Sequence, residues 1–136
     1  MTREAIERLP AGERMNIEVG KLLGYAKIRQ AWRMDFPGHM DLDDEPSEGR
    51  ELVIIYDDPK TGEELLPNFS GYIGAAWKAL EKIRGEKDAV RVFIDSLENG
   101  EWCVHLEPRN KIETYTAEEM TLPLAICRAA LLFYVA

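Results

Sequence analysis

The sequence has few of the residues and motifs from which enzyme sites are usually built. Its 136 residues include only two histidines, His39 and His105, and two cysteines, Cys103 and Cys127. These four residues do not show the spacing of a zinc site. The sequence also lacks a phosphate-binding P-loop, a GxGxxG dinucleotide pattern and a GxSxG nucleophile elbow. These absences favour a protein that is not an enzyme, and they predict neither a cofactor nor a metal site.

The two cysteines do not indicate a disulfide. Cys103 and Cys127 lie far apart and neither belongs to a CxxC pair. The opening "MTREAIERLP" lacks the apolar stretch that a secretory signal requires. We therefore expect both cysteines to be reduced thiols that fill core space.

Basic residues are scarce relative to acidic ones. The chain has 17 Lys and Arg against 25 Asp and Glu, which gives a net charge of −8. Nucleic-acid backbones and anionic membrane surfaces both require a basic face on their protein partner. The charge balance therefore argues against nucleic acid and against membranes as partners.

Only the last sixteen residues, "TLPLAICRAALLFYVA", form a long apolar run. A helix from Leu122 to Ala136 would span about 22 Å, against a hydrocarbon core of about 30 Å. Arg128 near its middle makes membrane insertion still less favourable. The run is therefore predicted to be a helix inside a folded domain.

The length and the hydrophobic fraction of 46% predict a single domain over residues 1–136. Apolar spacing and turn residues predict helices, strand pairs and one strand or extended arm. The expected helices cover 2–9, 12–23, 70–84 and the segment from about Thr121 onward; the expected hairpins pair 52–56 with 63–66 and 89–97 with 101–107; the strand or arm covers 25–36. The order α-ββ-α-ββ-α predicts the α+β class, as a three-layer α/β/α sandwich around a mostly antiparallel sheet.

An acidic loop is expected at 37–50, "PGHMDLDDEPSEGR". Its "DLDDE" at Asp41–Glu45 begins like a calcium loop, but Pro46 stands where the sharp turn needs glycine and Leu52 where a glutamate is needed. The loop is therefore expected to be mobile and to bind no metal. Its functional alternative is an anionic surface that engages a basic host protein or mimics nucleic acid.

Three residues are candidate contacts for a ligand or a partner. Asn68 and Ser70 stand at the start of the helix 70–84, where free N–H groups could hold a phosphate or a carboxylate, although the favoured interpretation is that Ser70 is a plain N-cap. Trp32 precedes the acidic loop and could anchor a partner. Trp77 and Trp102 are expected in the core between helix and sheet.

Two predictions concern the last helix: the burial of Arg128 and the covering of both helix faces. Arg128 lies on an otherwise apolar face, so it is expected to be largely buried and paired with backbone carbonyls or a carboxylate, with Glu81 or Asp95 as the proposed partner. Almost every direction around this helix is apolar, so both of its faces must be covered. A chain of this length offers few elements to do so, which favours a homodimer or a higher homo-oligomer.

Several segments resemble the phage ABA-sandwich domain family of small bacteriophage and prophage proteins. The C-terminal "TLPLAICRAALL" is similar to the end of the family almost residue for residue. "LPNFSGYIGAAWKALEKIR", the opening "MTREAIERLPAGERMNIEVGKLLGY" and "GEWCVHL" are similar to its helices and to a Trp-bearing strand. The resemblance covers most of residues 1–32 and 66–133 and leaves out 33–65. It implies a helix–sheet–helix arrangement and a place in the cytoplasm of the infected bacterial host, and it implies no catalytic residue.

The sequence and the resemblance together predict a phage-encoded accessory protein that acts by binding. The expected partner is a host protein or a small anionic ligand, such as a signalling nucleotide of antiviral defence. The nucleotide hypothesis depends on the phage setting and on the candidate anion site at Ser70. A nucleotide-processing hydrolase and a minor virion or assembly component are the alternatives.

Overall fold

The computed structural model describes residues 1–32, 52–85, 90–109 and 112–135. The helices are α1 (Arg3–Arg8), α2 (Glu13–Leu22), α3 (Ile73–Arg84) and α4 (Leu122–Val135), and the strands are β1 (Ala26–Trp32), β2 (Leu52–Asp58), β3 (Gly62–Leu65), β4 (Val90–Ser96), β5 (Trp102–Pro108) and β6 (Tyr115–Glu119). The predicted α+β class and both predicted hairpins are confirmed. The acidic loop 37–50, with Asp41–Glu45 and His39, lies outside the described residues.

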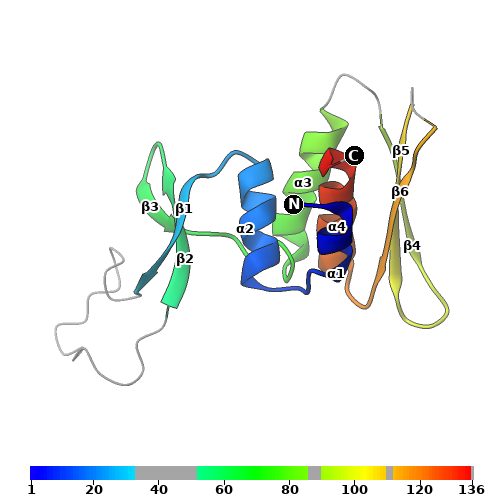
Figure 1. Ribbon diagram of the computed structural model, residues 1–136, viewed down its shortest axis with the longest axis horizontal. Helices are drawn as coiled ribbons and strands as arrows, with labels where there is room; N and C mark the ends of the chain where they lie inside the picture. The colour runs from blue at the N-terminus through cyan, green and yellow to red at the C-terminus, as the bar shows by residue number, and fades with distance from the viewer. Residues whose placement is uncertain (33–51, 86–89, 110–111, 136) are drawn as a thin grey trace.

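The strands form two three-stranded antiparallel sheets, β1-β2-β3 and β4-β5-β6, instead of the single sheet expected. Figure 1 shows the helices between these two sheets. Helix α3 separates the two hairpins in the sequence. Each hairpin pairs with a third strand that is adjacent to it in the chain, before the first hairpin and after the second. The first sheet gains β1, and the second gains β6 from "YTAEE", which the sequence analysis did not predict.

Helix α4 is the centre of the core. Residues 125–132 are all buried, and α4 packs against α1, α2, α3, β5 and β6. On β5 buried and less buried side chains alternate, because Val104 and Leu106 are fully buried whereas Cys103 and His105 are not. The prediction that both faces of α4 must be covered is confirmed, and elements of the same chain cover them. No helix in the described part of the chain is long and apolar enough to cross a bilayer.

The N-terminal helices follow their sequence signals. The Thr2 side chain accepts a hydrogen bond from the Ala5 N–H at 3.2 Å and so caps α1. Met15 and Val19 of α2 are completely buried, as their spacing predicts. Gly24 adopts a φ of 86°, which ends the helix in the left-handed conformation that glycine tolerates best.

The prediction that Trp77 is a core residue is wrong. The Trp77 side chain is 39% exposed, while the buried residues of α3 are Ala76, Ala79, Leu80 and Ile83. The buried face is thus rotated toward the two alanines, whose small side chains let α3 approach α4 closely, and this leaves Trp77 at its flank. Trp102 is partly buried and packs against the core.

Candidate functional site

The predicted site residues Asn68 and Ser70 belong to an internal hydrogen-bond network centred on Asn16. The Ser70 N–H and hydroxyl both donate to Asn16 Oδ1 at 2.8 Å, and the Ser70 hydroxyl accepts from the Gly12 N–H at 2.9 Å. The Asn16 side-chain amide donates to Asn68 Oδ1 at 3.0 Å. The network ties the loop before α3 to the start of α2.

The prediction that Ser70 caps α3 is therefore wrong. The N-cap residue is Tyr72, which makes no side-chain capping bond. Ser70 is 2% exposed and its donors are engaged within the chain, so the structure gives no support to an anion site there. The loop is also tightly packed, because a Cβ at Gly71 would lie 2.3 Å from the side-chain nitrogen of Asn68.

Trp32, the third candidate, lies outside this network at the end of β1. It pairs in register with Leu52 of β2, and both side chains are partly exposed, at 39% and 44%. The structure thus brings Asn68 and Ser70 together and leaves Trp32 on a separate surface.

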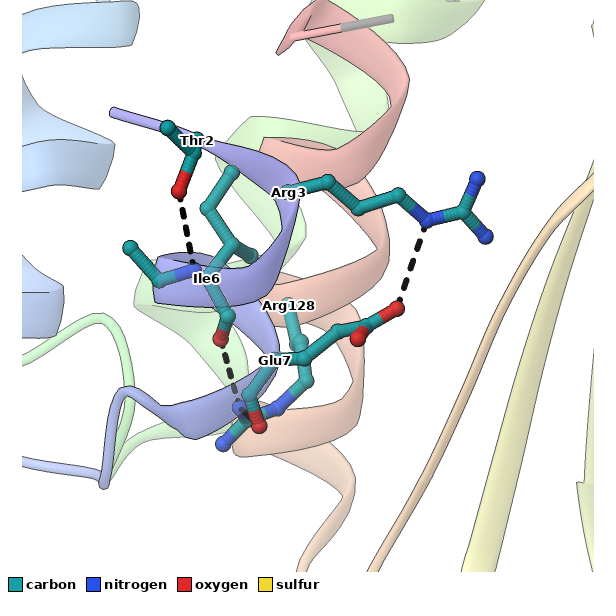
Figure 2. Close-up of polar contacts among 6 residues, drawn as sticks. Thr2, Arg3, Ile6, Glu7 and Arg128 are labelled. Atoms are coloured by element: carbon teal, nitrogen blue, oxygen red, sulfur yellow. Dashed lines mark hydrogen bonds and ion pairs between the residues drawn. The ribbon is translucent and has the colours of Figure 1, made fainter.

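Arg128 is a structural residue at the end of α1. It is 7% exposed, and its guanidinium donates to the carbonyl oxygens of Ile6 and Glu7 at 2.6 Å and of Leu9 at 2.5 Å. Figure 2 shows the guanidinium directed at the carbonyl end of α1. The last carbonyls of a helix have no hydrogen-bond partner within it and carry the negative end of its dipole. The Arg128 guanidinium donates hydrogen bonds to these carbonyls and places a positive charge beside them.

The predicted burial and pairing of Arg128 are confirmed, but the carboxylate partner is Glu119 rather than Glu81 or Asp95. Arg128 Nε lies 2.7 Å from Glu119 Oε1. The Nε–H does not meet hydrogen-bond geometry there. Because Coulomb attraction depends on distance more than on that angle, we count the contact as an ion pair.

A pocket of about 600 Å³, which the sequence does not predict, lies at the start of β1. We call it the tyrosine pocket. Its lining comes from the end of α2, the start of β1 and the end of β2: Leu23, Gly24, Tyr25, Ala26, Lys27, Tyr56, Asp57, Asp58 and Pro59. The rings of Tyr25 and Tyr56 meet edge to face with centroids 4.5 Å apart.

Lys27 gives the tyrosine pocket a strained backbone. It is the one described non-glycine residue with a positive φ, at 54°, and it stands where the β1–β2 register shifts between Ala26 and Arg29. A non-glycine residue in the left-handed region costs about 1 kcal/mol or more, and such strain clusters at binding sites. The bulge turns this part of β1 into the wall of the pocket.

The charged groups of the pocket are only partly neutralised. Asp57 accepts from the Arg29 guanidinium at 3.0 Å, and its other oxygen lies 3.8 Å from Lys27 Nζ. Asp58 accepts from the backbone N–H groups of Lys60 and Thr61, which lower the pKa of its carboxyl. Burial, followed by the nearby Tyr25 and Asp58, raises the pKa of Tyr56, so its hydroxyl stays neutral at physiological pH. The α2 carboxyl end adds a partial negative charge.

The second sheet carries a polar row on its outer face, away from α4. His105 contacts the Thr116 hydroxyl at 2.5 Å and a Glu107 carboxylate oxygen at 3.1 Å. Phe93 lies beside it, with ring centroids 6.0 Å apart. Among the residues that the structure describes, no group of three or more His, Cys, Asp or Glu side chains could hold a metal.

Two antiparallel sheets around a helical core, with an aromatic and acidic pocket where one sheet meets a helix, define a small α+β domain with a pocket of ligand size. The family model of the phage ABA sandwich domain matches residues 39–131. The chain therefore belongs to the phage ABA sandwich domain family and is a phage protein. The match includes much of the segment 33–65 that the sequence resemblance left out.

A solved structure supports the same fold. The 2.0 Å crystal structure of a phage protein from Bacillus cereus ATCC 14579 is 21% identical in sequence and superposes with a TM-score of 0.52. The alignment covers 92% of this chain and 95% of that chain. No curated protein matches the chain.

Proposed function

We propose that this phage protein acts by binding, and that the tyrosine pocket holds a positively charged side chain of a host protein. The observation that carries the proposal is the composition of the pocket: two tyrosine rings, two aspartates and the carboxyl end of a helix, against the single positive charge of Lys27. Aromatic faces attract ammonium and guanidinium groups, and carboxylates pair with them.

The overall charge supports a basic partner. A net charge of −8 raises the rate at which a basic protein meets this one and repels acidic competitors. The hypothesis of a small anionic ligand depended on Ser70, whose donors are engaged within the chain. A nucleotide would also bring its phosphates toward Asp57 and Asp58.

Binding of this kind suits an accessory protein that acts on a host system from within the infected cell, for example against antiviral defence. The catalytic alternative has less support, because His105 contacts the Thr116 hydroxyl and a Glu107 carboxylate but none of the three lines the tyrosine pocket. We therefore retain the prediction that the protein is not an enzyme.

Amide NMR of the full chain tests the proposal with three probes: a blocked Gly-Arg-Gly peptide, its Gly-Gln-Gly counterpart and ATP. The arginine peptide is expected to move the resonances of Tyr25, Lys27 and Tyr56 with a millimolar Kd, as suits a single side chain. The glutamine peptide should leave them in place. Shifts with ATP alone would point to an anionic ligand instead, and shifts with none of the three would exclude the pocket as the site.

A further inference from the structure

The strand β4 forms an edge of the second sheet, whose order is β4-β5-β6. It runs for seven residues, Val90–Ser96, and contains no proline. Its residues alternate between half-buried Val90, Val92 and Ile94 on the helix side and exposed Arg91, Phe93 and Asp95 on the outer side. An edge of this length offers unpaired backbone donors and acceptors to another strand.

The helix side of this edge is hollow, and all but one of the residues that line it are apolar. A groove of about 350 Å³ lies between α3 and β4, lined by Trp77, Leu80, Arg84, Val90, Val92 and Ile94. Trp77 is 39% exposed at this groove, and Phe93 on the outer side is 43% exposed. The edge is therefore flanked on both sides by large apolar groups that a second strand would cover.

The sequence of β4 is complementary to itself. If two copies pair antiparallel about Phe93, Arg91 of one copy lies opposite Asp95 of the other, twice over. Phe93 then faces Phe93 of the second copy, and Val92 faces Ile94 on the groove side. Opposite charges and aromatic pairs facing each other across strands each contribute to sheet stability, whereas like charges in that position oppose pairing.

Arg91 and Asp95 have no ion-pair partner in the described part of the chain. Asp95 instead lies in an acidic row with Cys103 and Glu118, in the register of β4, β5 and β6. Burial first, and then Glu118 and Asp95, raise the pKa of the Cys103 thiol. An arginine delivered from a second copy would relieve this repulsion.

We propose that two copies of this chain associate through β4, pairing antiparallel about Phe93 to form one continuous six-stranded sheet. The pairing is isologous, so a single twofold axis closes the assembly and no edge is left to propagate it through β4. Trp77 of each copy closes the groove over Val92 and Ile94. This surface is distinct from α4, which the same chain already covers.

Charge exchange tests the register. Arg91→Asp and Asp95→Arg each place like charges opposite one another twice, so each variant is expected to raise the dimer Kd by at least tenfold in sedimentation equilibrium. The double variant restores both pairs and should return the Kd to within a few-fold of that of the wild-type chain. Circular dichroism and thermal unfolding of each variant separate loss of pairing from loss of folding.

Cross-linking tests the axis. In a Cys103→Ser background, Phe93→Cys places the two new thiols opposite each other, at a separation that a disulfide can span. Oxidation should yield a covalent dimer of twice 15.5 kDa. Ser96→Cys is the matched control, because its two copies would lie roughly 20 Å apart and should stay unlinked.

A wild-type chain that remains monomeric at 100 micromolar would overturn the proposal. So would a dimer that survives both single charge reversals, or one that cross-links through Ser96→Cys and not through Phe93→Cys. A double charge variant that folds but fails to dimerise would overturn the proposed register.

Discussion

At the scale of single residues, Arg128 shows how one charge can be necessary inside an apolar helix. Its guanidinium closes the carbonyl end of α1 and pairs with Glu119. The sequence could predict that Arg128 needed partners, because a buried cation without partners is too costly. It could not predict which, because Glu119 belongs to a strand that the sequence pattern did not reveal.

Replacing this arginine should therefore destabilise the fold strongly. Arg128→Met is expected to lower the free energy of unfolding by about 3–5 kcal/mol, since it strands Glu119 and three carbonyl groups. Arg3→Met is the matched control, because Arg3 pairs with Glu7 on the surface, where such pairs contribute about 1 kcal/mol or less. Equal midpoints for the two variants in urea would contradict the assigned role.

The buried thiol of Cys127 links stability to alkaline pH. Burial raises its pKa from 9.0 to about 12, so the folded chain keeps a proton that the unfolded chain releases. This contribution is fully present below pH 9 and is lost as the pH rises toward 12, for a total of about 4 kcal/mol. Cys127→Ala should flatten the fall of the unfolding free energy between pH 9 and 12 relative to the wild-type chain. An unchanged slope would mean that Cys127 is not protected from solvent.

At the scale of elements, periodicity predicted the helices and both hairpins because those signals are local. It failed at α3, where the stripe of Ile73, Trp77 and Leu80 marks an amphipathic helix without saying which edge of the stripe faces the core. In the structure α3 packs against α4, and the edge that carries Ala76 and Ala79 is the buried one. It also failed at β6, whose "YTAEE" is too short and too acidic to be recognised without its partner β5.

The exposure of Trp77 gives a direct test at this scale. Trp77→Ala should cost about 1–2 kcal/mol, because much of the ring already contacts water. Leu80→Ala, three residues on and 1% exposed, should cost about 2–5 kcal/mol. Chemical denaturation of both variants, under conditions in which the chain is monomeric, checks the order. A larger loss of unfolding free energy for Trp77→Ala than for Leu80→Ala would mean that Trp77 is a core residue.

At the scale of the whole molecule, the tyrosine pocket exists because distant segments meet. Tyr25 and Lys27 reach Tyr56 and Asp57 only through the register of β1 with β2 and the bulge in it. The sequence contains hints, a glycine and a tyrosine just after α2 and "YDD" at the end of β2, but nothing in the spacing places them together. The predicted contacts Asn68 and Ser70 instead hold α2 to the loop before α3.

The central claim is that this pocket selects a positive charge, and Lys27 provides the sharpest test. Lys27→Asn removes the ammonium that competes for Asp57, and asparagine tolerates the left-handed backbone at this position. Arg3→Gln removes one positive charge from α1 and serves as the control. The measurement is the Kd of the blocked Gly-Arg-Gly peptide for the three proteins by NMR titration. We predict that Lys27→Asn tightens binding about fivefold, or about 1 kcal/mol, while the control stays close to wild type. Weaker binding of the arginine peptide to Lys27→Asn would contradict the account.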